Sequence, residues 1–139
     1  EGGVLSSVQF TGKKQRNELK YYYAAADVFI TTPWYEPFGI TPLEAMACGT
    51  PVIGSAVGGI KYSVADGKTG FLVPPNEPEI LAQKIIDFLN DKELQKNMSI
   101  NSIKRVNHLF TWNRVANMVS DLYEKIMVSK NVVIKNNVA

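Results

Sequence analysis

The 139-residue sequence predicts an α/β domain in which a parallel sheet is flanked by helices. Two observations lead to this prediction. Short apolar runs rich in β-branched and aromatic residues alternate with longer stretches of helical periodicity, which is the pattern of consecutive βα units. Hydrophobic residues make up 45% of the chain and aromatic residues 10%, enough for one domain of ordinary size to bury a core.

The first part of the chain predicts two extended runs and a helix between them. Val8 to Phe10 is a short extended run that ends at a Thr-Gly turn. Residues 13–26 carry apolar side chains at near-helical spacing. Asp27 to Thr31 has the composition of a buried strand. Residues 33–39 must form a loop, because two prolines and a glycine interrupt them.

The next helix is predicted to begin at Thr41 and to end at Gly49. Thr41 is a good N-cap and Pro42 suits the first helical position. Glu44 follows Thr41 by three residues and completes a capping-box pattern. Glycine is the commonest residue just beyond a helix end, which explains the position of Gly49.

The second half of the chain continues the alternation. Strands are predicted over residues 51–55 and 71–73. Helices are predicted over residues 60–65, 77–90, 91–110 and 112–128. Trp112 is expected to anchor the last helix in the core. Residues 130–139 show no clear period and are expected to form a polar tail.

Charge and cysteine content exclude several function classes. Fifteen Lys and Arg stand against thirteen Asp and Glu, and without Lys130 and Lys135 the balance over residues 1–129 is thirteen against thirteen. A nucleic-acid binder that works through bulk charge needs a basic excess, so we expect no nucleic-acid partner. One cysteine and one histidine cannot build a disulfide or a Cys-based zinc site. No apolar run approaches the ~20 residues of a transmembrane helix.

The most informative stretch is the loop after the strand at 27–31, because parallel sheets bind ligands at the carboxyl ends of their strands. Glu36 in this loop and Glu44 in the next helix lie eight positions apart. Between them, the N–H groups at Gly39, Ile40 and Thr41 point out of a helix start and can hold an anion. One ligand could then carry hydroxyls for both carboxylates and a phosphate for the amides.

The same pattern has a purely structural interpretation. Glu44 would then bond back to Thr41 as part of the helix cap, and Glu36 would be solvated. The local pattern does not choose between the two. Trp34, in the same loop, is an aromatic side chain that could touch a ligand or another domain. Gly58 and Gly59 could approach a ligand's phosphates or merely turn the chain.

Three segments of the sequence resemble a known family. They are residues 22–29, Glu-Pro-Phe-Gly at 36–39, and residues 43–53. The match continues at residues 57–59, 66–73 and 110–112. With these motifs, residues 8 to 127 resemble the donor-binding domain of family 4 glycosyltransferases, also called group 1. A Glu-x7-Glu motif framed by Phe-Gly and by Glu-Ala-Met-Ala is specific in that context.

This resemblance implies a Rossmann-like parallel sheet with flanking helices, the C-terminal part of an enzyme with the GT-B fold. Residues 1–129 would form a partial nucleotide-sugar (donor) binding domain, followed by the polar tail at 130–139. The implied activity is transfer of a hexose from a nucleotide-diphosphate sugar to an acceptor, with retention of configuration. No cofactor and no metal ion is implied.

The family's sugar-binding roles map onto the loop. Glu36 resembles the carboxylate that bonds the donor sugar's hydroxyls near the reacting carbon, and it is the candidate catalytic residue. The backbone of Phe38 and Gly39 resembles the part that cradles the hexose.

The nucleotide-binding roles map onto the helix. The amides of Ile40 and Thr41 resemble those that hold the diphosphate, and Glu44 resembles the carboxylate that binds the ribose diol. Lys13, Lys14 and Arg16 correspond to a region that borders the nucleobase, but a solvated charge cluster explains them better. We expect Tyr21, Tyr22 and Tyr23 to pack the helix rather than stack on a base.

The sequence departs from the family pattern at its start. Further βα units, with an Arg and a Lys for the diphosphate, and an N-terminal acceptor domain are expected before Glu1. We therefore expect a C-terminal piece that does not catalyse transfer alone. The acceptor is not identified, and we expect a cytoplasmic protein, with or without peripheral contact with a membrane. The alternatives are a non-catalytic nucleotide-sugar-binding module and another GT-B enzyme, such as a nucleotide-sugar epimerase.

Overall fold

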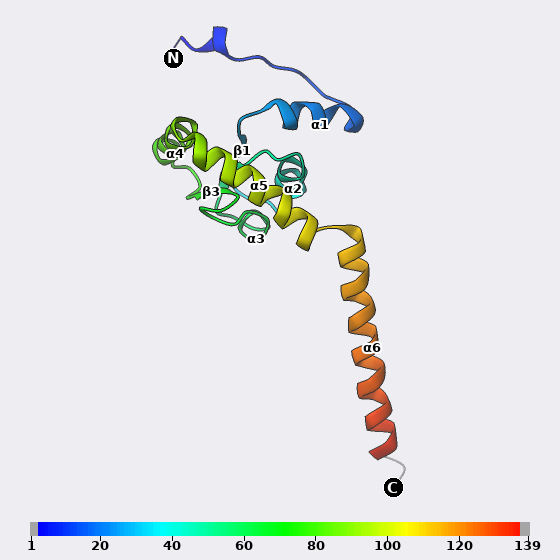
Figure 1. Ribbon diagram of the computed structural model, residues 1–139. Coiled ribbons are helices and arrows are strands. Elements are labelled where there is room, and N and C mark those ends of the chain that lie inside the picture. The colour runs from blue at the N-terminus through cyan, green and yellow to red at the C-terminus, as the bar shows by residue number, and fades with distance from the viewer. Residues whose placement is uncertain (1–2, 137–139) are drawn as a thin grey trace.

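A computed structural model describes residues 3–136 as a three-stranded parallel sheet with helices around it (Figure 1). The elements in chain order are a 3-10 turn η1 (Leu5–Ser7), α1 (Arg16–Ala25), β1 (Phe29–Thr31), α2 (Ile40–Ala47), β2 (Val52–Ser55), α3 (Ile60–Ser63), β3 (Gly70–Val73), α4 (Pro78–Asn90), α5 (Lys92–Leu109) and α6 (Trp112–Asn136). The strands lie in the order β1-β2-β3, and every pair is parallel. The predicted α/β fold with a parallel sheet is confirmed.

The central strand β2 divides the core into two halves. Val52 packs with residues of α2 and α3, whereas its neighbour Ile53 packs with Phe88 of α4 and Met98 of α5. Successive side chains of a strand point to opposite faces, so the two clusters lie on opposite sides of the sheet. All four residues of β2 are buried, as expected for a strand with a neighbour on each side and helices on both faces.

The predicted buried strand at residues 27–31 is shorter and less buried than expected. Only Phe29–Thr31 pair with β2, and Ile30 is 41% exposed. β1 is an edge strand in the described sheet, so fewer elements cover it. The extended run predicted at Val8 to Phe10 forms no strand, and Phe10 is 88% exposed. No described strand pairs with this run, and an unpaired strand is not stable.

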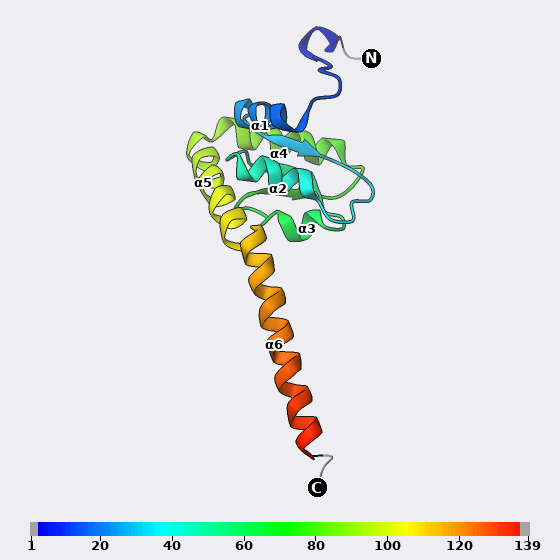
Figure 2. The same cartoon turned by 90° about the vertical axis from the view of Figure 1, so that its right-hand side faces the viewer.

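Helix α6 differs most from the expectation. It runs from Trp112 through Asn136, so the helix continues past its predicted end at residue 128 and includes residues 130–136 of the polar tail; residues 137–139 lie outside the described part. Trp112 is 87% exposed and anchors nothing in the core. Figures 1 and 2 show α6 projecting away from the sheet and from the other helices.

The exposed length of α6 is rich in apolar side chains. Besides Trp112, the large apolar side chains more than 40% exposed are Val115, Met118, Val119, Leu122, Tyr123, Ile126, Met127 and Val128. Several recur three and four positions apart, which is the spacing of one helix face. Even so, no helix among the described residues is both long and apolar enough to cross a membrane.

Candidate functional site

Glu36 organises the loop that joins β1 to α2. One oxygen of its carboxylate, Oε1, accepts hydrogen bonds from the backbone N–H of Gly39 at 2.9 Å and of Phe38 at 3.3 Å. The side chain is half-buried rather than free in solvent. Its other oxygen, Oε2, makes no hydrogen bond to a described residue. Glu36 therefore holds the loop with one oxygen and has the other available to a ligand.

Helix α2 begins earlier than predicted, and its cap is Gly39 rather than Thr41. Gly39 has φ 81° and ψ 50°, the left-handed region that glycine adopts at little cost. The first helical residue is Ile40, and no side chain caps the helix. The predicted capping box between Thr41 and Glu44 is wrong for this reason: Thr41 already lies inside the first turn.

Two of the three amides expected to hold an anion remain unpaired. The N–H of Gly39 is bonded to Glu36, whereas those of Ile40 and Thr41 have no hydrogen-bond partner in the described part of the chain. They belong to the first turn of α2, where N–H groups have no acceptor within the helix and carry the positive end of its dipole. An anion can bind at this position.

The turn at Gly58 and Gly59 packs directly against the Glu36 loop. The N–H of Gly59 donates to the backbone oxygen of Glu36 at 2.8 Å. A Cβ atom added at Gly59 would collide with the carbonyl of Phe38, and one at Gly58 with the carbonyl of Glu36. The glycines are needed here because two backbones meet, and they fix the position of the loop between β1 and α2.

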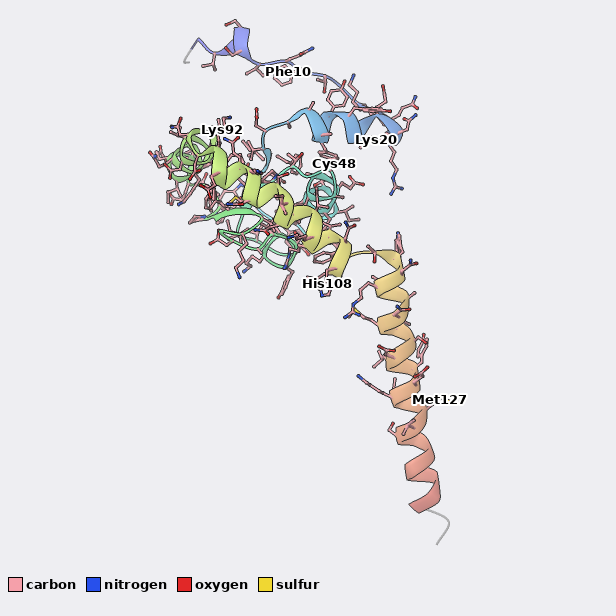
Figure 3. All side chains as sticks on the ribbon, viewed as in Figure 1. Phe10, Lys20, Cys48, Lys92, His108 and Met127 are labelled. Carbon is pink, nitrogen blue, oxygen red and sulfur yellow. The ribbon has the colours of Figure 1, made fainter. Side chains whose placement is uncertain are left out.

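Glu44 lies on the side of α2 that faces α1, beside a cavity of about 200 Å³. Its partner is Tyr23, whose hydroxyl donates to Glu44 Oε2 at 3.3 Å. Burial raises the pKa of Tyr23, and the negative charge of Glu44 and the hydrogen bond to it act in the same direction. Other residues at the cavity include Arg16, Lys20 and Cys48; Figure 3 labels Lys20 on α1 and Cys48 at the end of α2.

The contribution of α1 to this cavity was missed in the sequence. Arg16, Lys20 and Tyr23 stand at positions i, i+4 and i+7, the spacing of one helix face. That spacing was the available signal. Arg16 is exposed, as expected for a solvated charge, and it also lines the cavity that contains Glu44. Tyr23 does pack against Phe29, with ring centroids 5.4 Å apart, as expected for a helix-packing residue.

The two carboxylates have different surroundings. Glu36 faces the loop and the glycine turn, and it does not line the cavity beside Glu44. The unpaired amides of Ile40 and Thr41 lie between them in the chain. That one ligand spans both carboxylates stays a prediction. In the described residues, no group of three or more His, Cys, Asp or Glu side chains could hold a metal ion.

Comparison with known proteins points to one family. The family described as "Glycosyl transferases group 1" matches residues 2–105. The D-inositol 3-phosphate glycosyltransferase of Corynebacterium glutamicum (strain R) is 34% identical over 132 residues, which is 95% of this chain and 31% of that protein.

Solved structures agree with this match. Sucrose-phosphate synthase from Thermosynechococcus elongatus superposes with a TM-score of 0.81 at 40% identity, over 91% of this chain and 32% of its own. HepE from Anabaena, in complex with UDP and glucose, superposes with a TM-score of 0.80 at 27% identity, over 88% of this chain and 33% of its own. The chain thus spans about a third of the length of each of these three proteins.

Proposed function

This chain belongs to the group 1 glycosyl transferases, and on that premise we propose that it is the donor-binding part of a retaining glycosyltransferase. The full enzyme moves a hexose from a nucleotide-diphosphate sugar to an acceptor. Residues 1–129 form part of the donor domain. The observation that carries the proposal is the pair of unpaired N–H groups at Ile40 and Thr41, at the start of a helix that follows a strand's carboxyl end.

In this proposal the donor lies along the start of α2. The diphosphate accepts hydrogen bonds from Ile40 and Thr41, and the ribose diol bonds to Glu44. The hexose lies against the backbone of Phe38 and Gly39, with hydroxyls bonded to Glu36. The complexes of HepE with UDP and glucose, and with UDP-glucose, support a nucleotide-sugar as the ligand class.

The chemistry follows from where charge develops. Breaking the bond from the anomeric carbon to the diphosphate puts negative charge on the leaving group. N–H donors that are already oriented stabilise that charge without reorganisation. In this proposal, the oxygen of Glu36 that no described residue uses stabilises oxocarbenium character in the sugar ring.

The test compares two carboxylates in the enzyme at its natural length. Glu44→Ala is expected to weaken nucleotide binding, measured by calorimetry with UDP, GDP and ADP sugars. The loss of a charge-assisted hydrogen bond to the ribose costs about 1.5–3 kcal/mol. Glu36→Gln is expected to lower kcat instead, because its contact strengthens as the bond breaks. NMR of the product anomer tests retention of configuration.

The matched control is Glu79→Ala, at an exposed position in the first turn of α4. It should change neither nucleotide affinity nor kcat. Thermal denaturation of each variant separates binding from stability, because Glu36 also holds the loop. Equal effects of the Glu36 and Glu44 changes on nucleotide affinity alone would refute these roles. Tight nucleotide-sugar binding with no transfer to any acceptor would favour a non-catalytic binding module.

A further inference from the structure

A second cavity, of about 210 Å³, opens at the carboxyl ends of all three strands. We call it the Trp34 pocket. Thr32 follows β1, Ser55 ends β2, and the loop after β3 supplies Asn76 and Glu77. Trp34 comes from the same loop as Glu36, two residues earlier. None of the residues that line the cavity beside Glu44 lines this one.

The Trp34 pocket lies on the other face of the sheet from α2. Ser55 has the same parity along β2 as Ile53, which packs toward α4 and α5. Glu44 is on α2, which packs on the Val52 face. The loop between β1 and α2 passes from one face to the other. A ligand in the Trp34 pocket would therefore lie beside the donor site without occupying it.

Ser55 indicates that this pocket binds a polar ligand. The residue is only 1% exposed, yet its hydroxyl makes no hydrogen bond to any described residue. Every fully buried side-chain N or O atom in the described part has a hydrogen-bond partner. The unpaired hydroxyl of Ser55 must therefore be slightly exposed. The small exposed part of Ser55 borders the pocket. Buried hydroxyls are normally paired, so the partner of Ser55 must lie in the pocket, where a water molecule or a ligand hydroxyl can supply it.

The rest of the wall fits a sugar ring. Trp34 is 74% exposed and offers a flat apolar surface. Because its side chain has only two torsion angles, ordering it on binding costs little conformational entropy. The hydroxyl of Thr32, the amide of Asn76 and the carboxylate of Glu77 can pair with hydroxyls as donors or acceptors. No basic side chain lines the pocket among the described residues, which disfavours a phosphate or another anion.

We propose that the Trp34 pocket binds a sugar ring of the acceptor, with Trp34 against its C–H face and Ser55 bonded to one hydroxyl. This inference rests on the proposed function, since it places the acceptor beside the donor hexose. Trp34 is then a specificity-determining residue for the acceptor and has no part in holding the nucleotide.

The experiment uses the enzyme at its natural length with UDP, GDP or ADP, whichever binds, at saturation. Methyl α-D-glucopyranoside, methyl α-D-mannopyranoside and sucrose serve as probes, and saturation-transfer NMR reports their binding. Trp34→Ala is expected to weaken the bound glycoside about ten-fold and to leave the affinity for the nucleotide-sugar unchanged. Ser55→Ala should weaken the glycoside as well.

The control is Tyr35→Ala, in the same loop. Tyr35 is 78% exposed, like Trp34, but does not line the pocket, so its loss should not change glycoside binding. Equal losses in the two variants, displacement of the glycoside by the nucleotide-sugar, or no glycoside binding at all would overturn the inference. Failure of the wild type to bind any nucleotide-sugar sinks the proposed function instead, and that is a separate measurement.

Discussion

The hydroxyl of Tyr23 joins α1 to α2 by its hydrogen bond to Glu44. A neighbouring bond supports the same junction, since the Thr50 hydroxyl donates to the backbone oxygen of Tyr23 at 2.6 Å. The carboxylate of Glu44 is thus held by a side chain from an element that precedes it by 21 residues. This arrangement orients Glu44 toward the cavity that contains Arg16 and Lys20.

Tyr23→Phe removes that hydrogen bond and leaves the ring in place. We expect a loss of about 0.5–1.5 kcal/mol in the free energy of unfolding and a weaker affinity for the nucleotide, because Glu44 is no longer oriented. Denaturant unfolding and calorimetry measure the two effects. Tyr22→Phe is the matched control, since Tyr22 has no contact with Glu44. Unchanged nucleotide affinity in Tyr23→Phe would show that Tyr23 does not orient Glu44 for nucleotide binding.

Tyr23 also predicts a dependence of stability on pH. Burial and the charge of Glu44 raise its pKa in the folded protein. The folded state therefore favours the neutral phenol, and this contribution is fully present below the ordinary tyrosine pKa of about 10. It is lost as the pH rises through the folded-state pKa. We expect the free energy of unfolding to fall less steeply above pH ~10 in Tyr23→Phe than in the wild type, with Tyr22→Phe behaving as the wild type.

Between elements, the contact of the glycine turn with the Glu36 loop determines where α2 starts. Gly39 is buried, and a Cβ atom there would be 3.3 Å from Ser63 Oγ. The left-handed conformation at Gly39, the Glu36 bonds and the Gly59 bond form one unit. The unpaired amides of Ile40 and Thr41 follow directly from it.

Gly59→Ala tests this unit. The new Cβ collides with the carbonyl of Phe38, so the loop must move. We expect a destabilisation of about 1–3 kcal/mol and a clear loss of nucleotide affinity. Gly67→Ala is the control: it has a φ of 70° but no heavy atom within 4 Å of the added Cβ. It should cost about 1–2 kcal/mol of stability without changing nucleotide affinity.

Most elements could be predicted from local signals, but their surroundings could not. β2 is a short apolar run, and α4 and α5 have apolar residues at helical spacing. The structure has all three elements close to their predicted positions. The cap of α2 was predicted at Thr41 because its capping box is a strong local pattern. Gly39 is the cap instead, because it contacts the turn at Gly59, 20 residues away. A contact between segments so far apart in the chain cannot be read from a local sequence pattern.

Other errors have equally physical causes. Trp112 suggested an anchor, but helical periodicity does not say which element covers a side chain, and Trp112 is 87% exposed. Residues 130–136 contain no Gly or Pro, so a helix already formed continues through them by adding one hydrogen bond per residue. For the candidate site, the sequence indicates the loop and both carboxylates, whose roles stay predictions, but no pattern in it connects Tyr23 with Glu44.

For the whole molecule, the centre of the sheet and the last helix are expected to differ in stability. β2 is fully buried at the centre of the sheet, whereas α6 extends into solvent beyond Trp112. A 25-residue helix of about 37 Å gains most of its stability from packing, and few contacts hold this one. We expect the amides of α6 to exchange with solvent much faster than those of β2 in the 139-residue chain, measured by hydrogen-exchange mass spectrometry. Equal protection would mean that α6 is covered in solution.

The last prediction concerns activity. We expect the 139-residue chain, purified by itself, to bind nucleotide-sugars weakly and to show no transferase activity. It spans about a third of the length of the proteins it resembles. In the proposed donor site, the amides of Ile40 and Thr41 are neutral donors, so they add no full positive charge to balance a diphosphate. Transfer also needs an acceptor held in line with the donor, since positioning supplies a large part of the rate enhancement.

The assay incubates the chain with UDP, GDP and ADP sugars and follows released nucleotide, with the enzyme at its natural length as the positive control. Turnover by the chain at about 1 per second, an ordinary enzymatic rate, would show that these residues suffice for catalysis.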